Sequence, residues 1–446
     1  MAKDREVVAF AYLDEGWAPC GLLTMTEEGS TLLASRFSYG TRYLDRLNAV
    51  EVDPVSLGLH GDSVKGKVLL PVNELTSFGG IRDAAPDSWG RRVIEAKLKV
   101  PANSLRESDY LLHAGSNRVG ALDVRLTRDS EPAEGSTGGV HELEHLLDAA
   151  ERIDEGLPVP AHLEQIFIQG TALGGARPKA TVRDESGRLM LAKFATRKDS
   201  FDIPAVETAT LRLAGAAGLR VPAVQTQMLG DRRIMMIRRF DRYWLDKGVM
   251  PDGETDLTLA PKAGRSERRM AFVSGLTLVG CDESESNAKA YSDLAAAVRK
   301  YCHPTVIRQD SEELFKRMVF NVMVNNDDDH LRNHGFIWDP TLSGWRLSPL
   351  YDVLPRPSLA TDRYLHLGVG PDGRISTVDN ALAGAGQFSI NPARAGQLVA
   401  EVWAVVREWK VAFDEFGVSS QDIEKVAPAF RHIDDISSVE ARKLIG

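Results

Sequence analysis

The feature that most constrains this chain lies between residues 310 and 353, where four kinds of segment follow in a set order. A helical pattern over 310–326, with an apolar stripe through Leu314 and Met318, is followed by the acidic loop "DDDHLRN". Two strand patterns around "PTLSG" come next, and then a second acidic loop, "SPLYDV". Asp310, with a glutamate three residues later, predicts a capping box at the start of the helix.

Three consecutive aspartates, Asp327 to Asp329, occupy the first acidic loop. In protein kinases an Asp accepts the proton of the substrate hydroxyl, and an Asn five residues later binds magnesium. A second Asp, beyond the next hairpin, binds magnesium too. Asn333 lies five residues after Asp328, and Asp352 lies beyond the hairpin. The spacing therefore selects Asp328 as the base, with Asn333 and Asp352 as Mg²⁺ ligands.

The residues around Asp328 allow less specific interpretations. Asp327 and Asp329 are expected to be a turn or cap residue and a solvated flank. His330, two residues after Asp328, either points towards a phosphate or is a structural histidine held by hydrogen bonds. Both interpretations of His330 stay open.

A glycine-rich segment, "GTALGGARP" (170–178), lies between the strand patterns "QIFIQ" and "KATV". Glycines let backbone N–H groups approach an anion closely, and the neighbouring Arg177 and Lys179 add positive charge. The Walker pattern fails because Ala176 follows Gly175 and no helix follows the loop. A Gly-rich loop between antiparallel strands is the kinase arrangement, and the alternative is a glycine-rich hairpin with a solvated basic tip.

Lys193 lies in the strand pattern "RLMLAKFAT", on the face of Leu189 and Leu191. Kinases place the lysine for the α- and β-phosphates at such a position, one hairpin after the Gly-rich loop. The alternative is an edge lysine whose ammonium reaches solvent. Glu207, in a helix predicted over 204–219, is either the partner of Lys193 or a solvated helix residue.

Composition excludes several classes of protein. With 446 residues, two or three domains are expected. The net charge of -9 argues against a non-specific nucleic-acid binder. The three cysteines lie far apart without metal-ligand spacing, which predicts a reducing compartment and no zinc module. No apolar run is long enough to span a membrane, so we expect a cytoplasmic protein without a membrane partner.

The pattern of elements predicts a β-rich half followed by an α-rich half beyond residue 241, in two lobes. "VVAFAYLDEGWAPCGLLTM" (7–25) reads as a hairpin, and an amphipathic helix is expected from Asp87-Ser88 onwards. The polar segment "TRDSEPAEGSTGG" (127–139) reads as a linker, so the first domain boundary is expected there.

These motifs together resemble the HipA family of serine/threonine-protein kinase toxins, the partners of HipB-type antitoxins. "DDHLRN" (328–333) matches the family's catalytic stretch D-x-H-x-K-N, with Arg332 in place of the lysine. "SPLYDV" matches its metal loop, "GGARPKA" (174–180) its nucleotide loop, and "RRFDR" (238–242) the segment that joins its lobes. "YGTRYL", "GGIRDAAPDSWGR" and "SDYLLHAGSNRVGALDV" match its N-terminal part, so the likeness covers nearly the whole chain.

The resemblance implies an α+β, bilobal protein-kinase-like fold. Residues 1–129 would form an extra N-terminal subdomain, 130–242 the nucleotide-binding part of a β-rich N-terminal lobe, and 243–446 a predominantly helical C-terminal lobe. It also implies a kinase that uses ATP and Mg²⁺ to phosphorylate a serine or threonine of a protein. The known targets in the family are mainly aminoacyl-tRNA synthetases, so that translation and growth stop. A small helix-turn-helix antitoxin of the HipB type, bound to operator DNA, would sequester the kinase.

Carried over residue by residue, Asp328 and His330 would be catalytic, and Asn333 and Asp352 would hold the metal. The nucleotide-binding set would be Gly174, Gly175, Ala176, Arg177, Pro178, Lys179, Lys193, Arg238, Phe240, His330 and Asn333.

Besides Arg332, other positions depart from the family pattern. Family members often carry serines just before the paired glycines, one of them an inactivating autophosphorylation site, and this chain has Thr171 and Ala172 there. If that site is the position of Ala172, the inactivating autophosphorylation would be absent in this chain. Thr171 is then the candidate to replace the missing phosphorylation site. A glutamate is common where Arg238 stands, so an adenine contact there would run through backbone atoms.

Two other functions stay open. One is a non-catalytic, kinase-like binding module that acts in an antitoxin–operator complex and does not bind Mg·ATP. The other is a phosphohydrolase that uses "DDDH" (327–330) as a metal site. It would need further His or Asp ligands and would leave the Gly-rich loop unexplained.

Overall fold

The computed structural model describes residues 1–445 except 60–63, 134–136, 165 and 170–174. The described chain forms two compact units, each built from three segments. Unit 1 comprises Met1–Thr196, Arg238–Val273 and Ile337–Leu342, and unit 2 comprises Arg197–Ile237, Ser274–Phe336 and Ser343–Gly446. The three-part division expected at 129/130 and 242/243 stays a prediction.

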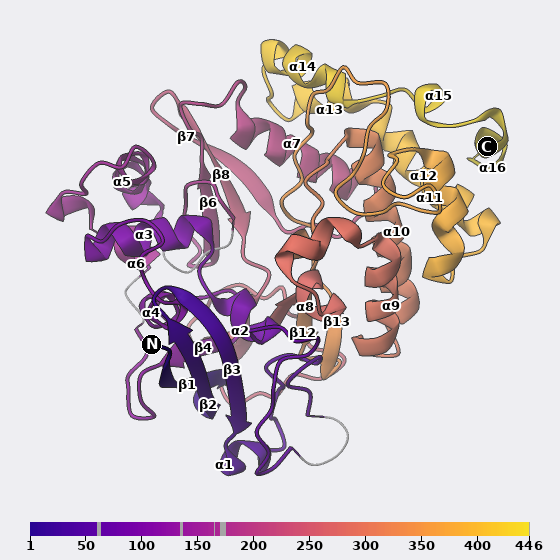
Figure 1. The fold of residues 1–446 in the computed structure, drawn as a ribbon. Coiled ribbons are helices and arrows are strands. Elements are labelled where there is room, and N and C mark those ends of the chain that lie inside the picture. The colour runs from indigo at the N-terminus through magenta and orange to yellow at the C-terminus, as the bar shows by residue number, and fades with distance from the viewer. Residues whose placement is uncertain (60–63, 134–136, 165, 170–174, 446) are drawn as a thin grey trace. The chain divides into compact units, whose positions relative to one another are not determined.

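An antiparallel four-stranded sheet opens unit 1 (Figure 1). Its strands are β1 (Lys3–Leu13), β2 (Gly16–Glu28), β3 (Thr31–Tyr39) and β4 (Leu122–Arg125), in the spatial order β3-β2-β1-β4. Leu23 and Met25 of β2 are buried while Thr24 and Thr26 between and beyond them are partly exposed, as a half-buried strand requires. The predicted N-terminal hairpin is confirmed.

Short helices lie between β3 and β4 along the chain of unit 1. They are α1 (Thr41–Leu44), α2 (Gly79–Ala84), α3 (Ser88–Leu98) and α4 (Glu107–His113). The helix expected after Asp87 is α3, and its predicted apolar stripe is buried at Trp89, Val93 and Ile94. The short helix α2 was not predicted.

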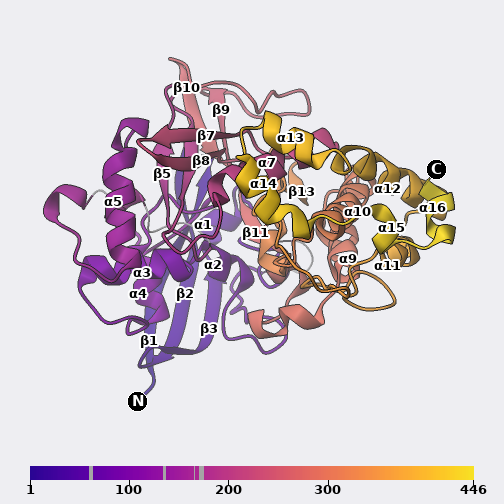
Figure 2. The ribbon, with the colours of Figure 1, turned by 90° about the horizontal axis from the view of Figure 1, so that it is seen from above.

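The linker region leads into α5 (Leu143–Asp154) and α6 (Ile166–Gln169), and then into the hairpin of β5 (Lys179–Arg183) and β6 (Leu189–Phe194). Figure 2 shows α5 beside α3, against which it packs. The prediction that "QIFIQ" is a strand is wrong, because this segment contains the helical turn α6, which packs against α3 and α5. A run of three apolar residues fits a strand or a helix equally well, so only tertiary packing decides. The element before the glycine-rich segment is therefore a helix and the element after it is the strand β5.

A second hairpin of unit 1 was not predicted. Strands β9 (Arg242–Asp246) and β10 (Arg265–Arg269) pair in antiparallel register, in a part of the chain where helical patterns were expected to dominate. Tyr243, Leu245, Met270 and Ile337 form its apolar core. The pairing joins segments separated by a long connection, which no local pattern reveals.

Unit 2 begins with α7 (Ile203–Ala216) and the hairpin of β7 (Val224–Leu229) and β8 (Arg232–Arg238). The Asp202 side chain caps α7 by accepting from the Ala205 N–H at 3.0 Å. Pro204 lies in the first turn, and Gly218 has a φ of 79° just beyond the helix, as predicted.

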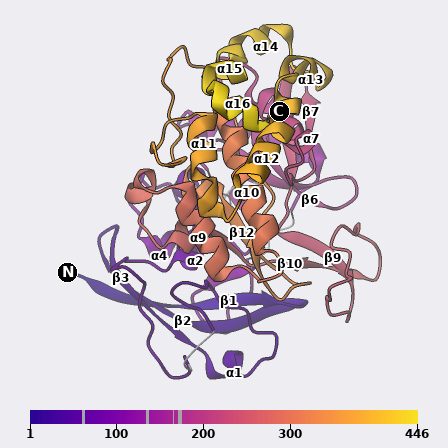
Figure 3. The same ribbon diagram turned by 90° about the vertical axis from the view of Figure 1, so that its right-hand side faces the viewer.

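Helices make up most of unit 2. Figure 3 shows α9 (Tyr291–Tyr301), α10 (Ile307–Val324), α11 (Val378–Gly384) and α12 (Pro392–Val406) side by side, with α10 in contact with the other three. Unit 2 also contains α8 (Gly275–Val279), α13 (Trp409–Glu415), α14 (Ser420–Val426), α15 (Ile433–Ile436), α16 (Val439–Ile445) and β13 (Gly344–Leu347). The residues of β11 (Phe272–Ser274) and β12 (Gly335–Asp339) are divided between the two units. Both strands expected after the catalytic loop are confirmed as β12 and β13.

The predicted capping box of α10 is wrong. The helix begins at Ile307, so Asp310 lies inside it and is fully buried. Its carboxylate accepts from Arg220 Nη2 and from the Leu347 N–H, both at 2.7 Å. A buried carboxylate with such partners is stable within a helix. The prediction failed because Asp310 is the first residue of the helical sequence pattern and so resembled a cap.

Candidate active site

The predicted catalytic loop begins where α10 ends. Asn325 adopts a left-handed conformation (φ 51°), and its side-chain amide donates to the main-chain carbonyl of Arg356. The next residue, Asn326, is buried and donates through Nδ2 to Asn321 Oδ1 at 3.1 Å. These two asparagines end the helix and turn the chain, so that the aspartates lie in a loop, as predicted.

Asp328, the predicted base, has an exposed carboxylate. The Nδ2 group of Asn333 donates to the Asp328 main-chain carbonyl at 2.7 Å and so closes the five-residue turn between them. Because this bond uses the amide nitrogen, the amide oxygen lies on the other side of the planar group. His330 lies in the same turn, with Nε2 4.0 Å from Asp328 Oδ1. One turn therefore holds three of the predicted site residues.

The second acidic loop is tied to the first by a hydrogen bond. Asp352 has a φ of 58°, a conformation rare for residues other than glycine and often found at functional sites. The preceding residue, Tyr351, donates its hydroxyl to the main-chain carbonyl of Arg332 at 2.8 Å. Because Arg332 immediately precedes Asn333, this bond links the chain next to Asp352 with the chain next to Asn333.

Sequence reasoning missed one side chain at this site. Arg356 places Nη2 2.8 Å from Asp328 Oδ2 and Nε 3.0 Å from Asp327 Oδ1. It lies four residues after Asp352, in a segment without a recognisable pattern. Only its closeness to Asp352 in the chain signalled a place near the site.

The prediction that Asp329 is a solvated flank is wrong. Its side chain is buried, and Oδ1 accepts the His366 N–H at 2.7 Å. Burial raises the pKa of Asp329 to about 7, against the lowering effect of hydrogen bonds from the Tyr291 hydroxyl and the His366 backbone. Through this bond to the His366 backbone, Asp329 fixes the predicted catalytic loop in place. Asp327 is half-buried, and burial also raises its pKa.

His330 lies next to a second histidine. The rings of His330 and His366 meet edge to face at a centroid distance of 5.9 Å, and His366 Nε2 is 3.1 Å from Ser286 Oγ. Burial lowers the pKa of His366, which favours its neutral form. The catalytic and nucleotide-binding roles of His330 stay predictions.

The described part of the predicted nucleotide loop, residues 175–178, belongs to unit 1 and is hydrogen-bonded to α3. Gly174, Thr171 and Ala172 lie outside the described residues, and the description resumes at Gly175. The Trp89 backbone N–H donates to the Gly175 carbonyl at 3.2 Å, and Trp89 Nε1 donates to the Lys179 carbonyl at 2.8 Å.

Arg92, one turn further along α3, adds a third bond to the loop. Its Nη2 donates to the Ala176 carbonyl at 2.6 Å. The amphipathic pattern of this helix predicts neither the bonds of Trp89 nor the contact of Arg92. Of the other predicted loop residues, Pro178 is buried and its carbonyl accepts from the Phe194 N–H at 3.0 Å, while Arg177 is partly exposed.

Two lysines lie opposite each other in the β5–β6 hairpin. Lys179 and Lys193 are direct register partners, with side chains 4% and 8% exposed. A Cβ added at Gly175, whose φ is 92°, would lie 2.3 Å from Lys179 Nζ. A larger residue there would displace this ammonium group, and the positive φ itself favours glycine. Two cations on one face of a hairpin form a site suited to an anion.

The segment "RRFDR" (238–242) is a structural junction. Arg239 and Arg242 both donate to the Arg118 carbonyl, at 2.7 and 2.8 Å, and Asp241 Oδ2 accepts the Gly120 N–H at 2.7 Å. Burial opposes ionisation of Asp241, yet the two guanidinium groups hold its pKa well below the usual range. This junction joins "RRFDR" to "GSNRVG" (115–120).

The two nucleotide residues expected in this segment lie beside the junction. Arg238 is partly buried, and burial lowers its pKa. The Phe240 ring lies 6.4 Å from that of Phe272 and packs against the core of the β9–β10 hairpin. Their adenine contacts stay predictions, and so does the pairing of Lys193 with Glu207, which is buried in α7.

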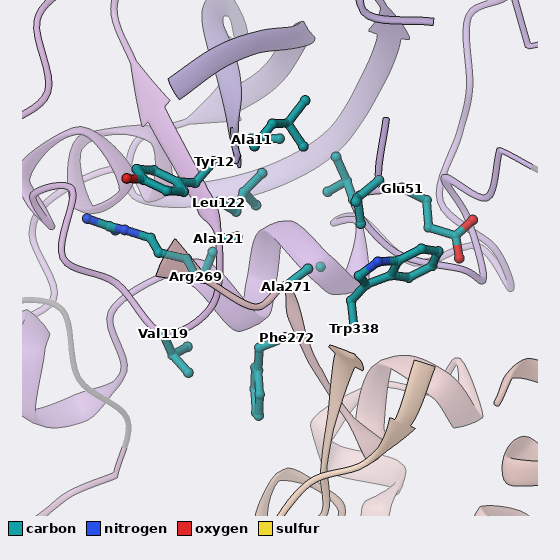
Figure 4. A pocket seen from close by; sticks show the side chains of 15 residues that line it. Ala11, Tyr12, Glu51, Val119, Ala121, Leu122, Arg269, Ala271, Phe272 and Trp338 are labelled. Atoms are coloured by element: carbon teal, nitrogen blue, oxygen red, sulfur yellow. The ribbon is translucent and has the colours of Figure 1, made fainter. Parts of the chain in front are cut away.

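Unit 1 contains a pocket that is separate from its predicted nucleotide-binding residues (Figure 4). It is lined by residues of β1, by Glu51 and by Arg269, whose guanidinium lies 5.0 Å from the centre of the Tyr12 ring. Its lining contains none of the predicted site residues.

Two further properties concern the described residues alone. Within them, no group of three or more His, Cys, Asp or Glu side chains is placed to hold a metal ion, so the ligand set required for a "DDDH" phosphohydrolase is not found there. None of their helices is both long and apolar enough to cross a membrane.

Comparison with known proteins gives one family match and one curated relative. A family model described as "HipA-like C-terminal domain" matches residues 171–409. The chain is 25% identical over 346 residues to a protein of Sinorhizobium fredii (strain NBRC 101917 / NGR234) named "Putative kinase Y4mE". That alignment covers 74% of this chain and 75% of the relative.

Solved structures show the same likeness. HipA of Shewanella oneidensis MR-1, solved with HipB and operator DNA, aligns with a TM-score of 0.64 at 15% identity, over 98% of this chain and 96% of that chain. The Helicobacter pylori proinflammatory kinase CtkA aligns with a TM-score of 0.41 at 12% identity, over 61% of this chain and 92% of that one. The alignment with HipA confirms the predicted α+β, protein-kinase-like fold.

Proposed function

The chain belongs to the HipA family, whose C-terminal domain it contains over residues 171–409, and from this premise we propose that it is an ATP- and Mg²⁺-dependent serine/threonine protein kinase. It would transfer the γ-phosphate of ATP to a protein hydroxyl and act as the toxin of a type II toxin–antitoxin system. The proposed target is an aminoacyl-tRNA synthetase, whose modification would stop translation and growth.

The observation that carries this proposal is the pair of linked loops in unit 2. Asp328 has an exposed carboxylate, and the Asn333 amide closes the turn beneath it at 2.7 Å. The Tyr351 hydroxyl ties the loop of Asp352 to the same turn at 2.8 Å. A base and two hard oxygen ligands on neighbouring loops are what phosphoryl transfer requires of a kinase.

The donor set fits magnesium. The carboxylate of Asp352 and the amide oxygen of Asn333 would be the two protein ligands, a number that suits Mg²⁺ because phosphates and waters would complete its shell. The left-handed backbone at Asp352 (φ 58°) supports a functional constraint on that carboxylate.

The hairpin of unit 1 fits the phosphates of a nucleotide. Lys179 and Lys193 face the same side of the hairpin, and Gly175 leaves space for the Lys179 ammonium. The carbonyls of Gly175, Ala176 and Lys179 accept bonds from α3, which fixes the path of the loop. We infer that these two lysines bind the phosphate oxygens of ATP, with Arg238 and Phe240 near its adenine.

The chemistry follows from these roles. Bound Mg·ATP supplies the phosphoryl group and the positive charge that offsets the charge developing on it. Asp328 orients the substrate hydroxyl and accepts its proton at the carboxylate. Asn333 and Asp352 bind and orient the metal, and Lys179 and Lys193 bind and orient the phosphates.

The proposed partner is a small helix-turn-helix antitoxin of the HipB type, which would join this chain to operator DNA. The structural likeness to a HipA solved with HipB and operator DNA supports this partner. The net charge of -9 supports contact with DNA through the antitoxin rather than through this chain.

The test is transfer of radiolabelled phosphate from ATP to proteins of a cell lysate, by wild type and by Asp328→Ala. Wild type is expected to label a protein band that mass spectrometry identifies, and Asp328→Ala is expected to label none while it keeps its circular dichroism spectrum. Full activity of Asp328→Ala would overturn the assignment of the base. Failure of wild type to bind Mg·ATP in calorimetry would favour the non-catalytic binding module.

A further inference from the structure

Arg356 follows the second acidic loop and is fastened to the end of α10 by its backbone. Its N–H donates to the Asn325 carbonyl at 3.1 Å, and its own carbonyl accepts from the Asn325 side chain. Asn325 is the left-handed residue that ends α10. Both the N–H and the carbonyl of Arg356 are therefore bonded to Asn325, in the turn that leads to the aspartates.

The side chain of Arg356 reaches two adjacent carboxylates. Nη2 lies 2.8 Å from Asp328 Oδ2, and Nε lies 3.0 Å from Asp327 Oδ1. Neighbouring carboxylates repel each other, and a guanidinium between them reduces this repulsion. The contact with Asp328 is a hydrogen bond, so it also sets the direction in which that carboxylate points, whereas the contact with Asp327 is an ion pair.

From this geometry we propose that Arg356 is a positioning residue for phosphoryl transfer, which holds the Asp328 carboxylate in the orientation that accepts the substrate proton. The proposal rests on the proposed kinase function. Arg356 holds one oxygen of Asp328, while the other faces His330 at 4.0 Å, and the Asp328 side chain remains 51% exposed. A substrate hydroxyl therefore has access to the carboxylate while the guanidinium is in place.

The contacts distinguish positioning from inhibition. An inhibitory latch needs a segment that can withdraw, whereas both backbone groups of Arg356 are bonded to the helix end.

The contacts of Arg356 also distinguish positioning from a stabilising ion pair. The Arg356 side chain is 52% exposed, and ion pairs at such exposure contribute little to stability. Its effect is therefore expected in turnover and not in folding.

The test compares wild type with Arg356→Gln, Arg356→Lys and a matched control, Arg308→Gln. Arg308 is an exposed arginine of α10 that pairs with Glu312, so the control removes one exposed ion pair from the same unit. Arg356→Gln is expected to lower kcat by about 10- to 100-fold with little change in the KM for ATP, because misplacement of a reacting group acts on turnover. Arg356→Lys should recover part of this loss, and Arg308→Gln should match wild type. Thermal unfolding of all four proteins should be alike.

Two further measurements separate action through Asp328 from a general effect. In an Asp328→Asn background, Arg356→Gln should cause no further loss of the residual rate, because a positioning residue has nothing left to position. Added guanidinium ions should restore part of the activity of Arg356→Gly, since the site is half exposed.

The outcomes keep this proposal distinct from the proposed function. If wild type transfers no phosphate, the kinase assignment fails. If wild type is active and Arg356→Gln keeps its kcat, positioning by Arg356 is overturned and the kinase assignment stands. A higher kcat in Arg356→Gln would also overturn it and would indicate a latch. Equal losses in the wild-type and Asp328→Asn backgrounds would show that Arg356 acts elsewhere.

Discussion

Lys179 and Lys193 are direct partners across the β5–β6 hairpin, and both side chains are buried. Like charges directly opposite each other in a sheet are unfavourable, and buried cations need anionic groups nearby. Under the proposed function, phosphate oxygens of bound ATP would contact both ammonium groups, which would account for two lysines in this register.

The first prediction concerns these two lysines. Lys193→Met and Lys179→Met should each weaken the binding of Mg·ATP by about tenfold or more, because each loses a charge-assisted bond to phosphate. Isothermal calorimetry measures the affinity. Lys247→Met, which removes an exposed lysine just after β9, is the control and should bind as wild type does. Unchanged affinity in both hairpin variants would place the nucleotide elsewhere.

The second prediction concerns the bond between Trp89 and the nucleotide loop. Trp89→Phe keeps an aromatic ring but removes the Nε1–H that donates to the Lys179 carbonyl at 2.8 Å. A buried carbonyl left without its donor should lower the free energy of unfolding by about 1 to 3 kcal/mol. Because the loop loses a support, the KM for ATP should rise as well. Denaturant unfolding and steady-state kinetics measure the two effects.

The control for this substitution is Trp244→Phe, at a partly exposed position of β9. It should affect ATP binding less than Trp89→Phe does. If Trp89→Phe lowers stability but leaves the KM for ATP unchanged, α3 supports the fold and not the nucleotide loop.

The sequence was most informative where the spacing of residues along the chain identifies the candidate catalytic residues. The choice of Asp328 among three aspartates rested on Asn333 five residues later, and the structure places both residues in one turn. The order of helix, acidic loop, two strands and acidic loop also matches the structure, because each of these elements is set by a local pattern.

The sequence was least informative where long-range contacts decide the structure. Asp310 looked like a helix cap but is a buried partner of Arg220, ninety residues away in the chain. Asp329 looked solvated but lies buried against the His366 backbone. Arg356 has no motif, and its role depends on a bond to Asn325 that no pattern encodes. In each case the partner is distant in sequence, so local patterns carry no signal for it.

The third prediction concerns the bond that links the two acidic loops. Tyr351→Phe removes the hydroxyl that donates to the Arg332 carbonyl at 2.8 Å. With that bond lost, Asp352 and Asn333 are less firmly held relative to each other, so the Mg²⁺ concentration for half-maximal activity should rise several-fold. Kinase assays over a range of Mg²⁺ concentrations measure it. Tyr364→Phe, at a half-exposed position, is the control and should behave as wild type. An unchanged Mg²⁺ dependence in Tyr351→Phe would contradict the link.

The fourth prediction concerns the pH dependence of stability and depends on Asp329. Burial raises its pKa from 3.8 to about 7 in the folded protein, whereas the unfolded chain keeps the ordinary value. Below about pH 4 both states carry the proton. As the pH rises from about 4 to about 7, the unfolded state loses the proton first, so folding loses at most about 1.4 kcal/mol per pH unit through this group. Above about pH 7 both states are ionised and the contribution is constant.

Asp329→Asn removes this titration while its side-chain oxygen can still accept the His366 N–H, so the variant tests the sign directly. Its free energy of unfolding, relative to that of wild type, should rise between about pH 4 and pH 7 and then stay level, because only wild type carries the ionising group. Denaturant unfolding at several pH values measures this difference. Asp372→Asn, which replaces an exposed aspartate of the same unit, is the matched control and should not reproduce this rise. A difference that falls with rising pH would mean that the buried carboxylate is stabilised in its charged form, and Asp329 would then be an ionised anchor of the catalytic loop.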